Sequence, residues 1–243
     1  MKAAASLGRT VLRLGALVLV CGVALQLAFL ARIALMLALD PQSTTFQRSE
    51  AWRLLVEKRQ IAWAQEWVPY ERISNHLKRA VIASEDAEFA DHFGIDWEAI
   101  EQAWERQQRN EQRSAQGRRP GKVVGGSTIS QQLAKNLLLS GERTLLRKGQ
   151  ELVLTMMLET LLSKQRMLEI YLNNVEWGEG LFGAQAAARY YFRVDAERLG
   201  PEQAARLAVM LPAPKRFEKR PASAYVVGRA ATIQARMGDV VLP

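Results

Sequence analysis

The first forty residues form the longest apolar stretch of the chain. From Leu14 to Leu30 the sequence carries no charge, and past Arg32 the apolar run resumes as far as Asp40. A helix that spans a bilayer needs about 20 apolar residues, and an arginine near its end can extend toward the interface. The pattern therefore predicts a transmembrane anchor over 14–39, preceded by a short N-terminal segment, 1–13.

Basic residues before this stretch predict its orientation. Lys2, Arg9 and Arg13 precede the apolar run, which by the positive-inside rule places the N-terminus in the cytoplasm and the rest of the chain outside it. A cleaved signal peptide is the alternative, with a small-residue site near Ala28–Ala31. The apolar stretch is longer than the roughly 7–15 residues of such a peptide, which favours an uncleaved anchor.

Beyond the anchor the spacing of apolar positions is helical. Residues 40–62 are polar and mixed in charge, which predicts a helical stalk, and 63–243 is predicted to be one all-α or mostly α domain. The exception is Arg106–Lys122, a basic stretch with Gly117, Pro120 and Gly121 that predicts a mobile loop. This loop is either a solvated linker or a flap that meets an anionic ligand.

Composition narrows the classes of ligand. The 243 residues are 49% apolar and 24% charged, as in a folded domain, and one Cys and two His make a Cys/His zinc site improbable. The net charge of +8 suits nucleic acid, anionic lipid or a phosphorylated ligand. An anchored domain outside the cytoplasm excludes nucleic acid as a partner, which leaves lipid headgroups or a phosphate-bearing substrate.

A carboxylate falls within an apolar helix face in the segment Ser74–Gly94, which we predict to be one helix that starts at Ser74 and stops at Gly94. Glu85 projects into the apolar stripe beside Phe89. Burial would raise its pKa, as a general base near neutral pH requires, but a core carboxylate satisfied by a neighbour fits equally well. His92 is expected at the C-terminus of this helix, where a cation is favourable.

The stretch VVGGSTISQQLAKN, residues 123–136, brings together hydroxyls, amides and a cation. If Ser127 caps a helix, Thr128, Gln132 and Lys135 share one polar face, and Asn136 follows. The preceding Gly-Gly pair allows close approach of the backbone, and a helix N-terminus favours anions. The face is either a wall that binds phosphate and sugar hydroxyls or a solvated surface, and the spacing of a Walker loop is absent.

A third helix is predicted over Arg143–Leu162, where Arg147, Lys148 and Glu151 share a polar face. An Arg147–Glu151 pair at i, i+4 is common on exposed helices and by itself indicates no function.

A fourth predicted helix begins at Lys164 and places Glu169 and Asn173 on one polar face. Gly178, Gly180 and Gly183 then predict a tight irregular loop before an alanine-rich helix.

Taken in order, these four stretches resemble the successive motifs of peptidoglycan glycosyltransferases, the enzymes that polymerise lipid II into glycan strands. The motifs are ASEDAEFADHFGIDW, GGSTISQQLAKNLL, RKGQELVLTMMLE and KQRMLEIYLNNVEWGEGLFGAQAAARYYF. The resemblance covers Trp67 to Pro221, and Ser130 replaces the usual threonine. We expect the monofunctional type, because the remaining chain leaves no room for a transpeptidase domain.

The resemblance implies a lysozyme-like, two-lobed domain on the outer side of the bacterial inner membrane. It implies that Glu85 is the catalytic base and Glu151 the second essential carboxylate. Lys135, Arg147 and Lys148 would meet the diphosphate. The other substrate-binding residues that we predict are Thr128, Gln132, Asn136, Phe89, Glu169 and Asn173.

The resemblance implies no obligatory cofactor, although a divalent Mg or Mn ion could sit at the diphosphate near Glu151. The expected partners are lipid II, the growing glycan strand, the bilayer and other proteins of cell-wall synthesis or division.

Two other functions remain as alternatives. A lysozyme-like hydrolase or lytic transglycosylase would also use a glutamate of raised pKa, but it needs no cluster of cations for a diphosphate. A non-catalytic scaffold could bind lipid II, yet it would have no need to keep both Glu85 and Glu151.

Overall fold

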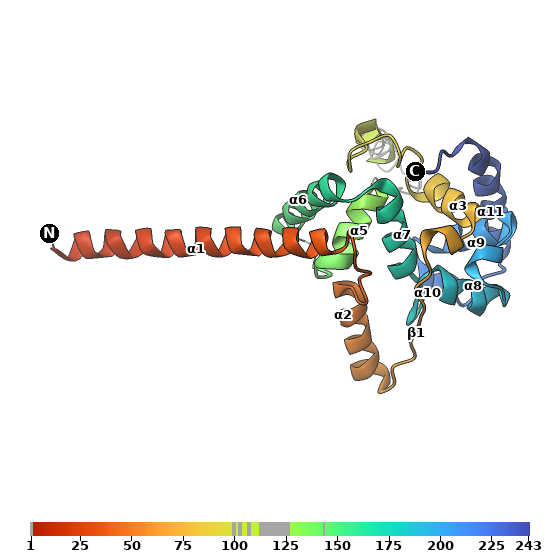
Figure 1. Cartoon of the computed structure of the whole chain (residues 1–243), viewed down its shortest axis with the longest axis horizontal. Helices are drawn as coiled ribbons and strands as arrows, with labels where there is room; N and C mark the ends of the chain where they lie inside the picture. The colour runs from red at the N-terminus through yellow and green to blue at the C-terminus, as the bar shows by residue number, and fades with distance from the viewer. Residues whose placement is uncertain (1, 99–100, 102–103, 106–107, 112–126, 143) are drawn as a thin grey trace.

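The structure is a computed structural model that describes residues 2–98, 101, 104–105, 108–111, 127–142 and 144–243, with the main chain alone for 2–11. A single long helix, α1 (Lys2–Leu35), extends away from a compact group of helices (Figure 1). Within it, Leu12–Leu35 has a mean hydropathy of 2.4 and is long and apolar enough to cross a membrane. The predicted anchor is therefore present as a helix, although it ends at Leu35 and not at residue 39.

The anchor helix contacts the domain directly through α6 (Leu145–Leu161). The side-chain amides of Gln26 in α1 and Gln150 in α6 exchange two hydrogen bonds, of 2.8 and 3.1 Å. Ile33 and Met36, near the end of α1, are buried in the core. The anchor is thus packed against the domain.

The predicted stalk is a packed part of the domain. It contains α2 (Thr45–Arg53) and a π-helical turn, η1 (Leu54–Lys58). Gln47 Nε2 donates to Asn174 Oδ1 at 3.3 Å, and Glu50 pairs with Lys215 at 2.6 Å. The stalk is helical, as predicted, but it is not separate from the domain. Its buried residues in α2 are these two polar ones, so the hydrophobic pattern gave no sign of burial.

Most of the domain is helical, which confirms the predicted fold class. In the core, α9 (Pro201–Met210) packs against α3 (Asn75–Glu85) and α11 (Ala224–Arg236), and its alanines are fully buried, which permits a close approach (Figure 1). Other helices of the domain include α5 (Ile129–Leu138), α7 (Lys164–Asn174), α8 (Ala184–Phe192), α10 (Pro214–Phe217) and the 3₁₀ turns η2 (Tyr70–Arg72), η3 (Ala196–Arg198) and η4 (Met237–Asp239).

A small sheet replaces the predicted glycine-rich loop. The order of its strands is β1-β3-β2, with β1 (Ala64–Gln65) parallel to β3 (Leu181–Phe182) and β2 (Glu176–Gly178) antiparallel to β3. Gly180 joins β2 to β3 with a φ of +69°, and a Cβ there would lie 2.0 Å from the carbonyl oxygen of Ala62. Glycine is therefore required, and the loop is a short hairpin.

The predicted basic loop, Arg106–Lys122, falls mostly outside the described residues. Its described part, 108–111, is helical, so we correct the loop assignment for these positions. The predicted flap over a ligand stays a prediction.

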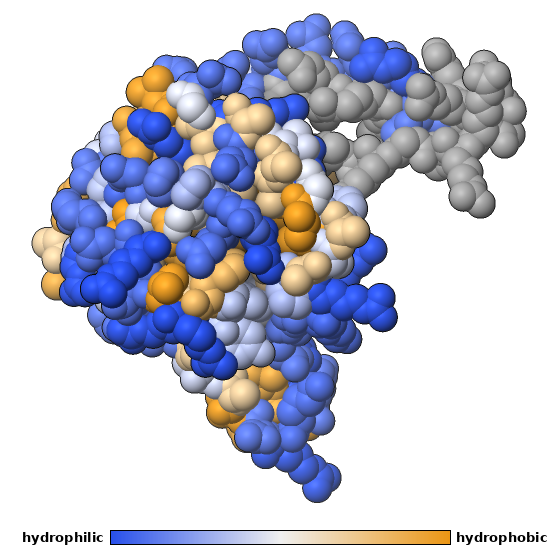
Figure 2. All heavy atoms as spheres, turned by 90° about the vertical axis from the view of Figure 1, so that its right-hand side faces the viewer, coloured by the Kyte–Doolittle hydropathy of each residue, from blue (hydrophilic) through white to orange (hydrophobic). Residues whose placement is uncertain are grey.

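The hydropathy of the surface differs between α1 and the face of the domain that is turned away from it. The face turned away from α1 is mainly hydrophilic, with apolar patches scattered over it (Figure 2). The long continuous run of exposed apolar side chains is instead on α1, from Leu12 onward. Exposed apolar side chains thus form a continuous run on α1, whereas the face of the domain turned away from it is mainly hydrophilic.

Candidate active site

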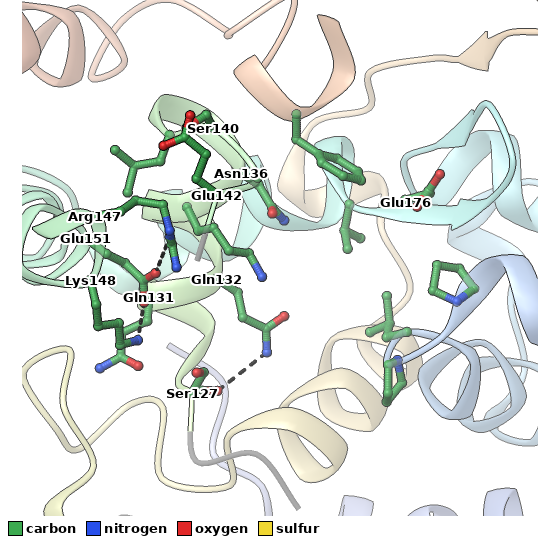
Figure 3. A pocket seen from close by; sticks show the side chains of 18 residues that line it. Ser127, Gln131, Gln132, Asn136, Ser140, Glu142, Arg147, Lys148, Glu151 and Glu176 are labelled. Carbon is green, nitrogen blue, oxygen red and sulfur yellow. Dashed lines mark hydrogen bonds and ion pairs between the residues drawn. The ribbon is translucent and has the colours of Figure 1, made fainter. Parts of the chain in front are cut away.

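A cavity of about 500 Å³ opens beside α5 and α6 (Figure 3). On this side it is lined by polar residues that the sequence predicts to bind substrate or to act in catalysis: Gln132, Lys135, Asn136, Arg147, Lys148 and Glu151. We call Lys135, Arg147, Lys148 and Glu151 the cationic wall. Glu176 lies across the cavity from Arg147 and Glu151, and the other lining residues include Phe46 from α2, Val175 and the connection between α9 and α10. The consecutive helices α5 and α6 thus bring two of the predicted polar faces to one space.

Glu85 is the last residue of α3, so the helix does not continue to Gly94 as predicted. The next residue, Asp86, is extended, with a φ of −164°. Its carboxylate accepts from the main-chain nitrogen of Ile129 at 2.8 Å and lies 2.8 Å from Nε2 of His92. We therefore correct the predicted single helix and the predicted place of His92 at its end.

Asp86 is a positioning residue that the sequence analysis missed. Because Oδ2 of Asp86 binds the first N–H of α5, the end of α3 is fixed against the start of α5. This contact brings Glu85 beside Gln132. The periodicity of a single helix could not predict this contact, because it joins residues 43 positions apart.

An uncharged amide holds the Glu85 carboxylate. Gln132 Nε2 donates to Glu85 Oε2 at 3.0 Å, and Gln132 Oε1 accepts from the hydroxyl of Tyr171 at 3.0 Å. Burial raises the pKa of Glu85, although the hydrogen bond from Gln132 opposes this rise. The complete burial of Tyr171 raises its pKa well above the usual value, so it stays a donor. The result is a half-buried carboxylate with a raised proton affinity.

Two cations hold the other carboxylate, Glu151. Its Oε2 is 2.9 Å from Arg147 Nη1, which confirms the predicted i, i+4 pair, and its Oε1 pairs with Lys148. Glu151 is 4% exposed, and Nε of Arg147 is buried without a hydrogen-bond partner among the described residues. The guanidinium therefore retains a donor that an anion in the cavity could satisfy.

Lys135 and Asn136 extend the cationic wall along α5. Lys135 is exposed and Asn136 partly exposed, and both line the cavity. The predicted polar face of α5 is thus confirmed for Gln132 and Lys135, and Asn136 lines the same cavity. A lysine, an arginine and a second lysine at one end of a cavity suit a ligand with several negative charges.

Thr128 and Phe89 lie outside the cavity. Thr128 caps α5 in place of the predicted Ser127: its Oγ1 accepts from the main chain of Gln131 and donates to the carbonyl of Gly94 at 2.8 Å. Phe89 is fully buried under the ammonium of Lys164. Both side chains are buried beside the site and expose no surface that a ligand could contact. The Gly125-Gly126 pair lies outside the described residues.

Glu169 and Asn173 also have structural partners. Asn173 is fully buried, and its amide exchanges hydrogen bonds of 2.9 Å with the main chain of Val68. Glu169 accepts from the main chain of Tyr70 and pairs with Arg166 at 2.7 Å. The shared polar face on α7 therefore holds the segment before α3, and we correct the expectation that it faces the cavity.

The described residues do not form a resident metal site. Nowhere in this part of the chain are three or more His, Cys, Asp or Glu side chains grouped to hold an ion. Glu151 offers one carboxylate, but both of its oxygens already accept from cations, with which a metal would have to compete. A divalent ion brought by the substrate's own phosphates stays a prediction.

Comparison with known proteins agrees with this arrangement. The sequence profile described as "Transglycosylase" matches residues 54–238. The chain is 52% identical to the biosynthetic peptidoglycan transglycosylase of Burkholderia orbicola, over 98% of this chain and 94% of that protein. Identity to the proteins of the same name from Burkholderia lata and Paraburkholderia xenovorans is 54% and 50%, over 90% and 95% of this chain and 86% and 92% of theirs. With a half-buried glutamate and a cationic wall inside the matched range, the chain belongs to the transglycosylase family.

Proposed function

We propose that this chain is a membrane-anchored peptidoglycan glycosyltransferase, which joins lipid II into β-1,4-linked glycan strands and releases undecaprenyl diphosphate. One observation carries the proposal: Glu151, which lines the cavity, and Glu85, which is bonded to the lining residue Gln132, have opposite surroundings. Glu85 is held by an amide and has a raised pKa, whereas Glu151 is held by two cations. The names of the relatives support the class of substrate.

Glu85 acts as the general base. It takes the proton from the 4-hydroxyl of the acceptor sugar while that oxygen forms a bond to C1 of the donor sugar. A base whose pKa is raised toward the working pH transfers protons most efficiently, and burial supplies that rise here. Tyr171 and Gln132 act as positioning residues, because the amide can present Nε2 to Glu85 only while Oε1 accepts from the tyrosine.

The cationic wall receives the leaving group. As the bond from C1 to the diphosphate oxygen breaks, the electron pair moves onto the diphosphate and its negative charge grows. Cations that are already in place stabilise this charge more in the transition state than in the bound substrate. Attack from the face opposite the diphosphate inverts the configuration at C1.

Glu151 orients the cations of α6. Each of its oxygens binds one cation, so the carboxylate holds Arg147 and Lys148 side by side at the cavity. A fixed arginine and lysine lose less freedom when they bind phosphate than free side chains would.

The proposed location is the bacterial inner membrane, with the N-terminus in the cytoplasm and the domain on the outer side. The apolar helix α1 and the basic residues that precede its span support this orientation. Lipid II then reaches the domain within the bilayer. Contacts with other proteins of cell-wall synthesis or division stay a prediction.

The test uses the purified full-length protein in detergent with fluorescent lipid II, beside Glu85→Gln. We expect the wild type to make polymer that lysozyme digests, and Glu85→Gln to lower the rate about 10²- to 10⁴-fold, the usual contribution of a general base. Glu88→Gln is the matched control, because it removes an exposed carboxylate three residues away.

Three outcomes would contradict the proposal. Tight binding of lipid II without polymer from the wild type would indicate a scaffold. Release of fragments from preformed glycan would indicate a lytic enzyme. Equal rates for Glu85→Gln and Glu88→Gln would exclude Glu85 as the base.

A further inference from the structure

Glu176 in β2 is a buried carboxylate that the mechanism above does not use. It lines the cavity on the wall opposite the cationic wall, across from Arg147 and Glu151 (Figure 3). Its side chain is only 9% exposed, and its buried Oε1 has no hydrogen-bond partner among the described residues. A buried polar atom without a partner is unfavourable, unless a ligand in the cavity supplies the partner.

The charged groups around Glu176 do not satisfy it. The nearest cation is Nζ of Lys215 in α10, at 3.4 Å from Oε1. That ammonium lies closer to Glu50 of α2, at 2.6 Å. Glu218, which follows α10, adds a further carboxylate and accepts from the main chain of Glu179. One shared lysine thus faces several carboxylates.

The balance of these surroundings favours the neutral acid. Burial raises the pKa of Glu176 to about 7, and Glu50 and Glu218 add to the rise while Lys215 opposes it. A protonated carboxyl both donates and accepts, whereas the ionised form only accepts. A neutral group also avoids repulsion of the diphosphate that the opposite wall would hold.

We propose that Glu176, in its protonated form, donates a hydrogen bond to an uncharged oxygen of the saccharide substrate, a hydroxyl or an amide carbonyl, on the side of the cavity that faces the cations. This inference rests on the function proposed above and assigns a role to the wall that carries no predicted site residue. Phe46 of α2 also lines the cavity and offers an aromatic surface to the apolar face of a sugar ring. One wall would then bind charge and the other uncharged polar groups.

The experiment measures binding and not turnover, so that its failure differs from failure of the proposed function. Full-length protein with Glu85→Gln is titrated with fluorescent lipid II in detergent, from pH 6 to pH 8.5. We expect the Kd to rise about tenfold as Glu176 ionises, the size of one hydrogen bond. Adding Glu176→Gln should abolish this dependence, because an amide donates at every pH.

Two further variants sharpen the test. Glu142→Gln removes an exposed carboxylate from the same cavity and should leave the pH dependence intact. Lys215→Met removes the cation that lowers the pKa of Glu176, so the midpoint of the Kd curve should move to higher pH. This second shift decides the matter even if Glu176→Gln unfolds, which its melting temperature would reveal.

The same pH dependence of the Kd with Glu176 and with Gln at this position would overturn the inference. An unchanged midpoint in Lys215→Met would do so as well. A pH dependence that follows Glu176 in a protein whose wild type makes no polymer would support the binding role and reject the synthase.

Discussion

Two carboxylates of the site illustrate how surroundings set the role of one side-chain type. Glu85 ends α3 and meets an amide, so burial raises its pKa. Glu151 lies within α6 and pairs with an arginine and a lysine, so it holds these two cations in place. The first carboxylate can accept a proton during the reaction, whereas the second orders charged neighbours.

The largest effect that would sharpen this comparison comes from Glu151→Gln. With one carboxylate gone, Arg147 and Lys148 lose their common partner and leave the geometry that receives the diphosphate. We expect the polymerisation rate to fall about 10²- to 10³-fold, as for the loss of an oriented electrostatic group. Unlike Glu85→Gln, it should also weaken binding of lipid II, which fluorescence titration would measure. Unchanged binding would show that the cations hold their places without Glu151.

Replacing each of the two carboxylates by glutamine should change the stability at pH 8 in opposite directions. The folded-state pKa of Glu85 is raised, so its contribution to stability is fully present below the unfolded pKa of about 4.3 and is lost as the pH rises through the folded pKa. Thermal unfolding at pH 8 should therefore occur at a higher temperature in Glu85→Gln than in the wild type, and the difference should vanish at pH 4.

Glu151→Gln should instead lower the free energy of unfolding at pH 8 by about 1–3 kcal/mol, because it leaves a mostly buried guanidinium unpaired. The loss is smaller than for a fully buried pair since the Lys148 side chain is half exposed. A gain in stability from this change would contradict the role of Glu151 as the partner of both cations.

A change at Gln132, the amide beside Glu85, should have a smaller effect and should act on only one of the two carboxylates. Gln132→Ala removes a hydrogen bond that lowers the pKa of Glu85, so that pKa should rise further. Since the base acts when ionised, the acidic limb of the kcat/KM profile should move to higher pH, and the rate at pH 7 should fall about tenfold. Tyr171→Phe leaves the amide in place, and its shift should be smaller. Equal shifts in the two variants would mean that Gln132 lowers the pKa of Glu85 only while Tyr171 holds the amide in place.

The smallest effect should come from removal of metal. Arg147 and Lys148 already neutralise Glu151, so chelation with EDTA should change the rate by no more than about twofold, well within the energy of one hydrogen bond. Full loss of polymer, restored by Mg²⁺ or Mn²⁺, would show that an ion shares the site with the two cations.

The sequence was sufficient where a contact follows the period of one helix. Arg147 and Glu151 are one turn apart, and Gln132 and Lys135 are three apart, so both pairs could be placed on a face before the structure was known. The apolar anchor could be predicted for the same reason, because length and hydropathy are local properties.

Contacts between distant segments could not be predicted. Asp86 ends α3 by binding Ile129, and Gln47 secures α2 by binding Asn174, and neither contact leaves a periodic pattern. The hairpin at Gly180 was missed because its strands are too short to alternate visibly. Thr128 and Asn173 were placed on ligand faces since a polar residue that bonds to a buried main chain looks, in sequence, like one that faces a ligand.

The paired amides of Gln26 and Gln150 have a consequence for how a lipid-linked substrate would reach the site. Since α1 is held against α6, and α6 carries Arg147 and Lys148, an α1 that spans the membrane as proposed above would set these cations at a fixed height relative to the lipid. A lipid-linked diphosphate would then meet them by lateral diffusion in one leaflet, with no excursion into water. Encounter rates would follow the surface density of the substrate and the fluidity of the bilayer. A polymerase held in this way would slow when the membrane stiffens, even with its chemistry unchanged.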